Sequence, residues 1–465
     1  MQKFLVILLI LFVSVTMSAQ DVTGQWYGVL KVQGTQLRLV FNVTKSGTAL
    51  SSTMDSPDQG AKGIPVTKTT FENSKIKFEV SNAMIEYNGE LNNDEIVGSF
   101  KQAGQEFPMN LSRKAIEKEV VKRSQEPTKP YSYYSEDVIF PNAKANISLA
   151  GTLTLPKKDG NYPVVILISG SGAQNRDGEL LGHKPFLVIS DYLTKNGIAV
   201  LRYDDRGFRK STGNFETATS ADFATDAESA VAYLKTRKEI NPKKIGLMGH
   251  SEGGIIAPMV AAKSKDISFI VLLAGTGIQG DKIVLLQQEL IAKANGAPEM
   301  EIKKSVEGNA KLLEMVVQSN NDEKLKSELR NRLNELIKDN SDKEIPQGMT
   351  KEQYISLRVS VITSPWMQYF LKYNPQAVLE KVKCPVLAVN GEKDLQVPPK
   401  ENLTAIKNAL IKGGNKNVTT IEFPNLNHLF QESTTGSPTE YDKIEQTFAP
   451  VALDEITKWI QKLTK

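Results

Sequence analysis

The chain has 465 residues, of which 40% are hydrophobic and 24% charged, an ordinary globular mixture on a chain too long for a single core. The formal net charge is +4, from 57 basic and 53 acidic residues. With no long basic block interleaved with aromatic residues, nucleic acid is excluded as an expected partner. The single cysteine, Cys384, excludes an internal disulfide framework and a cysteine-based metal cluster. It precedes a buried-looking strand, so we interpret it as a core thiol.

The first 20 residues have the pattern of a targeting segment. Lys3 supplies a positive charge, residues 4–13 form an unbroken apolar run, and residues 14–20 end in small and polar side chains. The run is too short to span a bilayer. We therefore predict a secretory signal peptide over residues 1–20, a secreted or periplasmic mature protein, and no stable membrane span after cleavage. The alternative is an uncleaved anchor.

Residues 21–113 have an all-β pattern. Residues 36–43 and 75–80 alternate apolar and polar side chains with period two, and turn clusters at 45–47, 56–60 and 92–94 separate such runs. The pattern predicts a small antiparallel barrel or sandwich, which loosely resembles a lipocalin-type barrel. The resemblance implies a ligand cavity; the alternative is a spacer or a lid on the next domain.

Residues 114–134 form a predicted linker. A charged stretch over 114–123 predicts a short helix with a solvated face, and Pro127 and Pro130 follow it in a strap rich in tyrosine.

From residue 135 to 465 the pattern becomes α/β. Apolar strand candidates alternate with helical stretches such as 186–195 and 223–237, which predicts a parallel sheet covered on both faces, with active residues at the carboxyl ends of its strands. Only helical periodicity occurs over residues 278–381, so this insertion is predicted to be a cap over the site. The strand candidates are 147–155, 164–169, 199–203, 245–248, 269–273, 386–390 and 419–423.

The sequence from Gly249 to Gly253 carries the pattern G-x-S-x-G, between an apolar strand and a helix-forming stretch at 255–263. In this pattern the serine lies on a strained strand-to-helix turn, and both glycines lack side chains so that strand and helix can pass closely. Ser251 is therefore the candidate nucleophile. The amide of Glu252, in the first turn of the helix, is a candidate oxyanion donor. The alternative is a Gly-rich turn with a serine cap.

A nucleophilic serine requires a base, and the chain has three histidines. His250 adjoins the serine and is expected to point away from its hydroxyl, whereas His183 precedes the nucleophile at a helix entry. His428 follows the last strand on a loop and fits the order serine, acid, histidine, so it is the predicted base.

The acid is expected after a strand between the serine and the histidine. Asp394, at the end of a Gly-containing turn after strand 386–390, is the predicted orienting acid. Glu392 is the second choice and Asp281 the third. The alternative for Asp394 is a cap on the helix that begins near Pro398.

The second oxyanion donor is expected in the Gly-rich loop after strand 164–169. We nominate the amide of Ser171, with Gly172 as the alternative. In the cap, Trp366 and Phe370 are candidate substrate-binding residues because aromatic side chains supply apolar surface for acyl groups. The alternative is that both belong to the cap's own core.

Four motifs within residues 135–465 resemble those of the α/β-hydrolase superfamily, and more narrowly those of secreted bacterial carboxylesterases and serine-aminopeptidase-like hydrolases. They are Ser169–Gly178, with Asn175 before Arg176, and Leu201–Gly207, Gly249–Gly254 and Gly391–Val397. The resemblance implies that Ser251, Asp394 and His428 form a catalytic triad and that Asp204, Asp205 and Arg206 have a supporting or structural role. The family's members cleave esters and relatives cleave peptides. The N-terminal β domain departs from the family pattern.

The predicted fold class is thus an α/β-hydrolase sheet with a helical cap insertion, preceded by a small all-β domain that is a lipocalin-like barrel or sandwich. The expected function is hydrolysis of short-chain carboxylic esters through an acyl-enzyme, on a small-molecule substrate and with no metal or organic cofactor. One alternative is a serine peptidase that uses Glu252, Glu179 or a cap carboxylate to bind the substrate's amino terminus. Another is a non-catalytic protein that binds a lipophilic ligand.

Overall fold

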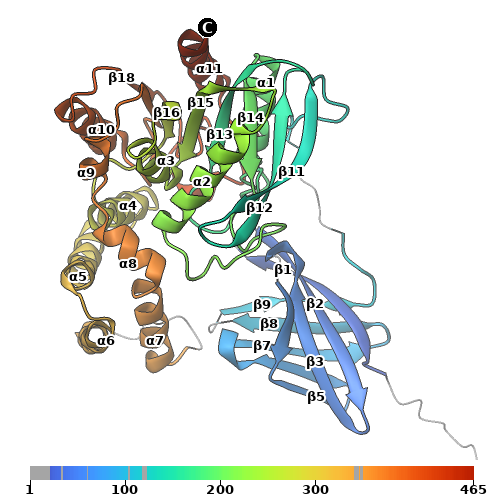
Figure 1. Ribbon diagram of the computed structural model, residues 1–465. Helices are drawn as coiled ribbons and strands as arrows, with labels where there is room; N and C mark the ends of the chain where they lie inside the picture. The colour runs from blue at the N-terminus through green and yellow to red at the C-terminus, as the bar shows by residue number, and fades with distance from the viewer. Residues whose placement is uncertain are drawn as a thin grey trace, which may run out of the picture. The chain divides into compact units, whose positions relative to one another are not determined.

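The computed structural model describes residues 21–32, 35–59, 61–102, 105–117, 123–339, 345 and 349–465. The chain divides into two compact units, residues 1–118 and 119–465. We describe each unit by itself (Figure 1). The predicted signal segment, residues 1–20, lies outside the described residues.

The first unit is a single antiparallel sheet in the order β4-β3-β2-β1-β10-β8-β7-β6-β5, with β9 paired to β8. A hydrogen bond of 3.0 Å links Thr69 Oγ1 in β5, at one end of this order, to Ser52 Oγ in β3, next to the strand at the other end, so the sheet closes toward a barrel. The strands are β1 (Gly24–Val32), β2 (Thr35–Ser46), β3 (Ala49–Ser56), β4 (Ala61–Val66), β5 (Lys68–Glu72), β6 (Lys75–Val80), β7 (Ile85–Asn92), β8 (Glu95–Gln102), β9 (Gln105–Pro108) and β10 (Leu111–Ser112).

Aromatic side chains fill the interior of this sheet. The rings of Phe41 and Phe78 stack with centroids 4.4 Å apart, and Tyr87 packs beside both. Trp26 and all three of these residues are 0% exposed, so the described part of the barrel has a solid core. The predicted all-β domain is confirmed. Its packed centre favours the structural role over the ligand cavity.

The second unit contains an eight-stranded sheet in the order β11-β12-β14-β13-β15-β16-β17-β18. β11 and β12 form an antiparallel hairpin, β12 pairs antiparallel with β14, and the pairs from β14 to β18 are parallel. The strands are β11 (Tyr134–Asn142), β12 (Ile147–Leu155), β13 (Tyr162–Ile168), β14 (Ala199–Tyr203), β15 (Ile240–His250), β16 (Ile267–Leu273), β17 (Val386–Gly391) and β18 (Val418–Phe423).

Helices cover both faces of this sheet (Figure 1). One core lies under α2 (Ser220–Lys235), α3 (Gly253–Ala261) and α10 (Pro399–Lys412). The other lies under α1 (Pro185–Lys195) and α11 (Pro450–Thr464). The central strands are buried on both faces over most of their length, which explains why most of their residues are apolar. The α/β-hydrolase fold class predicted from the sequence is confirmed.

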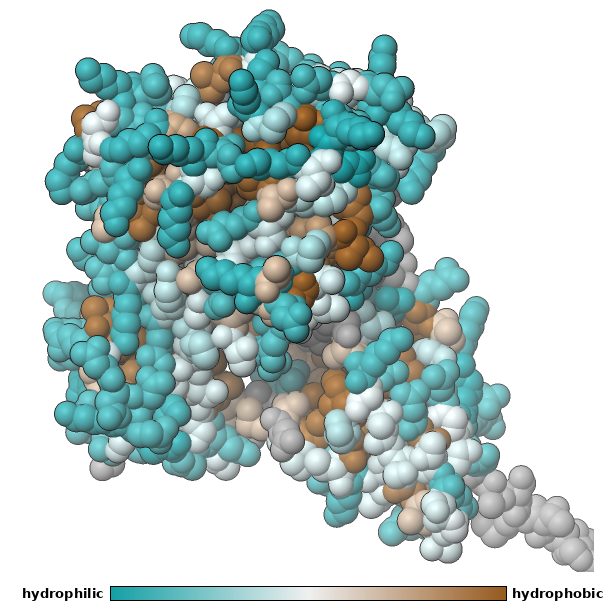
Figure 2. All heavy atoms as spheres, viewed as in Figure 1, coloured by the Kyte–Doolittle hydropathy of each residue, from teal (hydrophilic) through white to brown (hydrophobic). Residues whose placement is uncertain are grey.

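The insertion between β16 and β17 is helical. It contains α4 (Gly280–Ala294), α5 (Glu299–Gln318), α6 (Asp322–Asp339), α7 (Lys351–Ile362), α8 (Pro365–Lys372) and α9 (Pro375–Leu379). Leucines and isoleucines of α5, α6 and α7 form a separate core, on which Phe370 of α8 packs. The outer surface around α6 is mostly hydrophilic in Figure 2, as expected for a helix with one buried stripe.

Two sequence expectations differ from the structure at the start of this unit. β11 was not among the strand candidates. The helix expected over residues 114–123 is not formed at residues 114–117, and residues 118–122 lie outside the described part. The Ile116 carbonyl, which a helix would pair with an amide four residues on, instead accepts a 3.5 Å hydrogen bond from Arg38 Nη1.

Residues 123–126 form a strap bound to a loop near the C-terminus. The Gln125 side chain accepts hydrogen bonds from the amides of Thr447 and Phe448 and donates one of 2.7 Å to the Phe448 carbonyl. Arg123, 7% exposed, pairs with Glu445 at 3.1 Å. The strap therefore belongs to the second unit, which begins before the predicted start at residue 135.

Candidate active site

Ser251 lies on a strained turn at the carboxyl end of β15. Its φ is +52°, a left-handed conformation that is unfavourable for a residue with a side chain. The packing around the flanking glycines, Gly249 and Gly253, leaves no room for a side chain, as expected. A Cβ atom on Gly249 would lie 1.9 Å from the Gly253 carbonyl oxygen, and one on Gly253 would lie 2.3 Å from that of Ile168. Side chains at either position would therefore force strand, turn and helix apart.

The structure brings His428 and Asp394 together. His428 Nδ1 lies 2.8 Å from Asp394 Oδ2, and the residues are 4% and 2% exposed. The other carboxylate oxygen, Oδ1, accepts hydrogen bonds of 2.8 Å from the amides of Gln396 and Val397. Asp394 follows β17 and His428 follows the neighbouring strand β18, so the sheet's order accounts for the pairing. The carboxylate is thus fixed on one side by backbone and on the other by the imidazole.

The alternative acids are placed differently. Glu392 is exposed and accepts a hydrogen bond from the Asn425 amide at 2.9 Å. Asp281 lies in the first turn of α4. Helix α10 begins at Pro399 with no side-chain cap at Pro398, so Asp394 is not its cap.

The other two histidines have structural partners. His183, 1% exposed, contacts Thr447 Oγ1 at 3.0 Å and the Tyr441 carbonyl at 2.9 Å. Burial and the Arg123 guanidinium lower its pKa.

His250 supports the loop of the predicted base, a role that sequence reasoning missed. Its Nε2 lies 3.0 Å from the His428 carbonyl oxygen, and the two rings have centroids 4.8 Å apart. Burial, followed by the nearby His428, lowers the pKa of His250 to about 3. The ring is therefore neutral at pH 7, and Nε2–H donates to the carbonyl.

The loop after β13 lies against the nucleophile. A Cβ atom on Gly170 would be 3.2 Å from Ser251 Cβ, so the glycine permits this approach. Ser171 and Gly172 are exposed, and Gly172 has a φ of +88°. The Glu252 amide precedes the first residue of α3, where amides have no partner within the helix. The structure thus places the nominated donors on two segments that meet at Ser251.

The Glu252 side chain links the elbow to the cap. Its Oε1 accepts hydrogen bonds from Ser220 Oγ at 2.5 Å and from Trp366 Nε1 at 2.8 Å. Glu252 is 3% exposed, and burial raises the pKa of its carboxyl. The Trp366 ring stacks on Phe370 with centroids 5.2 Å apart. Trp366 is therefore fixed beside the elbow, whereas Phe370 also packs on the cap core.

Within the described residues, no group of three His, Cys, Asp or Glu side chains is placed to hold a metal ion. The helices in the same part of the chain are all too short or too polar to cross a membrane.

The sheet is mostly parallel and eight-stranded, with a serine elbow after a central strand and an acid and a histidine after the two strands at one edge. This arrangement defines the α/β-hydrolase fold. A comparison with protein-family models identifies the family. Residues 146–414 match the model of X-Pro dipeptidyl-peptidase (S15 family), and the chain belongs to this family.

Curated relatives include esterases. The chain is 28% identical over 320 residues to Esterase EstD of Thermotoga maritima, an alignment that covers 68% of this chain and 66% of EstD. It is 28% identical over 131 residues to a putative carboxymethylenebutenolidase of Synechocystis, covering 27% of this chain and 52% of that protein. The chain thus spans just under two thirds of the first relative and about half of the second.

Similar solved structures are a Pyrococcus furiosus esterase and the α/β hydrolase GrgF from Penicillium. The first has a TM-score of 0.44 and 17% identity, covering 72% of this chain and 92% of the esterase. The second has a TM-score of 0.45 and 18% identity, covering 71% of this chain and 99% of GrgF.

Proposed function

We propose that the protein hydrolyses carboxylic esters of short acyl chains, with Ser251, His428 and Asp394 as catalytic triad. The observation that carries the proposal is the buried 2.8 Å contact between His428 and Asp394, together with a strained serine elbow whose preceding residue, His250, contacts His428. The carboxylate holds the proton on Nδ1, so that Nε2 is free to accept the proton of the serine hydroxyl.

In the proposed reaction, Ser251 Oγ attacks the ester carbonyl while His428 takes its proton. The amides of Ser171 and Glu252 bind the oxyanion, and the proton passes from His428 to the departing alcohol. Water then attacks the acyl-enzyme by the same route and frees the acid. Each step uses only groups of this chain and water.

A serine peptidase is the second candidate, and the family match favours it. Cleavage next to a substrate's amino terminus needs an anion that can pair with the ammonium group. The Glu252 carboxylate is the candidate nearest in sequence to the nucleophile, but it is buried and already accepts two hydrogen bonds. Burial and two donors leave it poorly suited to this task, and the name of EstD adds support for an ester substrate.

A substrate panel distinguishes the two functions. We expect p-nitrophenyl acetate or butyrate to give a higher kcat/KM than an aminoacyl or X-Pro p-nitroanilide, with Ser251→Ala as the blank for both. A higher kcat/KM for the anilide would decide for the peptidase. Equal turnover of the acetate by wild type and Ser251→Ala would contradict the assignment of the nucleophile.

We also propose that the mature protein is secreted or periplasmic, because the positive charge of Lys3 and the apolar run at residues 4–13 are typical of a signal peptide. Amino-terminal sequencing of the exported protein should begin near residue 21. A sequence that begins at Met1 would contradict cleavage.

A further inference from the structure

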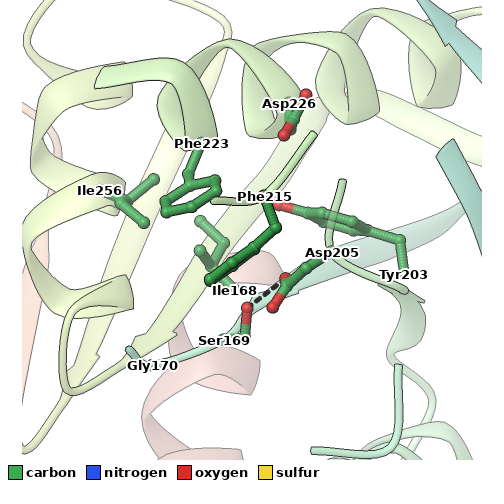
Figure 3. A pocket seen from close by; sticks show the side chains of 9 residues that line it. All are labelled: Ile168, Ser169, Gly170, Tyr203, Asp205, Phe215, Phe223, Asp226 and Ile256. Carbon is green, nitrogen blue, oxygen red and sulfur yellow. Dashed lines mark hydrogen bonds between the residues drawn. The ribbon is translucent and has the colours of Figure 1, made fainter. Parts of the chain in front are cut away.

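Asp205 is a buried carboxyl group that the proposed reaction does not use. It follows β14 and is 7% exposed. It lines a small cavity of about 10 Å³, and Asp226 lines the same cavity (Figure 3). A carboxyl group buried among apolar rings and a second carboxyl costs stability, so its presence calls for a reason.

Asp205 is bonded to both ends of the loop after β13. Ser169 Oγ donates to Asp205 Oδ1 at 2.5 Å, the contact drawn as a dashed line in Figure 3. The Gln174 amide donates to Oδ2 at 2.8 Å, and the Asp205 amide donates back to the Gln174 carbonyl at 3.1 Å. Three hydrogen bonds to one residue therefore define where residues 170–173 begin and end.

The residues between these two ends lie at the nucleophile. Gly170 approaches Ser251 so closely that a Cβ atom would lie 3.2 Å from Ser251 Cβ. Ser171 and Gly172, the nominated oxyanion donors, are exposed. Since the exposed residues have little packing of their own, the hydrogen bonds with Asp205 help to hold their amides in one orientation, together with a 3.4 Å hydrogen bond from Gln174 Nε2 to the Ser171 carbonyl.

We propose that Asp205 is a positioning residue for ester hydrolysis, which holds residues 169–174 so that the amide of Ser171 or Gly172 faces the oxyanion at Ser251. This inference rests on the proposed function, because it requires an oxyanion at that serine. The pKa of Asp205 is raised to about 7, mainly by burial, and the hydrogen bonds from Ser169 and Gln174 limit the rise. The loop thus stabilises the carboxylate that holds it.

The test compares Asp205→Leu with Asp205→Asn on p-nitrophenyl acetate. Leucine keeps the branched shape but accepts no hydrogen bond, so we expect kcat to fall about 100-fold, as for loss of an oxyanion donor, with KM changed by less than about twofold. Asparagine can accept from the Gln174 amide and donate to Ser169 Oγ, so kcat should stay within about fivefold of wild type.

A trifluoromethyl ketone, which forms an oxyanion adduct on a serine, reports the oxyanion site directly. Its inhibition constant should rise in Asp205→Leu by the same factor as kcat falls. Asp226→Asn is the matched control, because Asp226 lines the same cavity but bonds to Arg206 and Asn142 rather than to the loop. It should lower the melting temperature and leave kcat within about twofold.

The inference is overturned if Asp205→Leu keeps kcat within about threefold, if the ketone binds it unchanged, or if Asp226→Asn loses as much activity. Should Asp205→Leu not fold, Ser169→Ala removes one of the three bonds and is expected to lower kcat about fivefold with unchanged KM. An active Ser251→Ala protein would instead refute the proposed function. An inactive Ser251→Ala beside a fully active Asp205→Leu refutes this inference alone.

Discussion

Replacing Asp394 by asparagine tests the proposed triad most sharply, because the structure fixes how the new amide must lie. The Oδ1 position faces two backbone N–H donors, from Gln396 and Val397, so it must be occupied by oxygen. Reversing the amide would leave two buried donors unpaired, at about 1–3 kcal/mol each. The NH₂ group therefore faces His428 Nδ1, and this nitrogen must accept.

An accepting Nδ1 places the imidazole proton on Nε2, where it prevents proton uptake from Ser251. We expect kcat to fall about 10⁴-fold, as is typical of this tautomer error. That loss corresponds to about 5.4 kcal/mol of transition-state stabilisation. Because asparagine keeps the volume and the two backbone hydrogen bonds, the melting temperature should change little.

The assay is the initial rate of p-nitrophenyl acetate hydrolysis, with thermal unfolding measured on the same preparations. Glu392→Gln is the control, because Glu392 is exposed and bonds to the Asn425 amide; we expect full activity. Asp394→Asn within about tenfold of wild type, or a larger loss in Glu392→Gln, would refute the assignment of the acid.

Ser251→Ala and His428→Ala should each abolish turnover, and the double variant should be no worse, since the pair acts as one unit; His183→Ala should lower the melting temperature but not kcat, and the reverse ranking would show the wrong base was chosen. Trp366→Phe removes the hydrogen bond to the buried Glu252 carboxyl, worth about 0.5–1.5 kcal/mol. A changed acyl-chain preference, measured across p-nitrophenyl esters from acetate to octanoate, would assign the ring to the substrate site, whereas a lower melting temperature with unchanged preference would assign it to cap packing. The pKa of His250, lowered to about 3, means that unfolded protein binds a proton below pH 6.5 that the folded protein does not. Its contribution to stability is therefore complete above pH 6.5 and lost as pH falls toward 3, so the free energy of unfolding should fall less steeply between pH 6.5 and 4 in His250→Gln than in wild type; parallel curves would contradict this.

The central strands were predictable because they are buried on both faces. The interval 199–203 is apolar apart from Arg202 and coincides with β14. β11 was missed because it lies at the sheet edge and alternates: Val138 and Phe140 are buried, while Ile139 is 71% exposed. Pro141 within it also argues against a central strand, although an edge strand tolerates proline.

The candidate site was predictable where chemistry follows chain order, and not where it depends on contacts between distant segments. Three histidines and one G-x-S-x-G turn left few choices for the nucleophile and base. No pattern indicated that Trp366 would donate to Glu252, or that Asp205 would hold both ends of the loop after β13. Such contacts join residues from separate elements and follow only from the packed fold.

The strap at residues 123–126 changes where the catalytic unit can be separated from the β unit. Gln125 supplies, through one side-chain amide, the hydrogen bonds that a neighbouring strand would give to residues 447–448. Phe448 stacks on Phe430, two residues beyond His428, and the Ala449 amide donates to the Phe430 carbonyl. A fragment that begins at residue 135 therefore loses the hydrogen bonds from Gln125 that support the segment packed on the His428 loop. A stable fragment has to retain the chain from Arg123 onward.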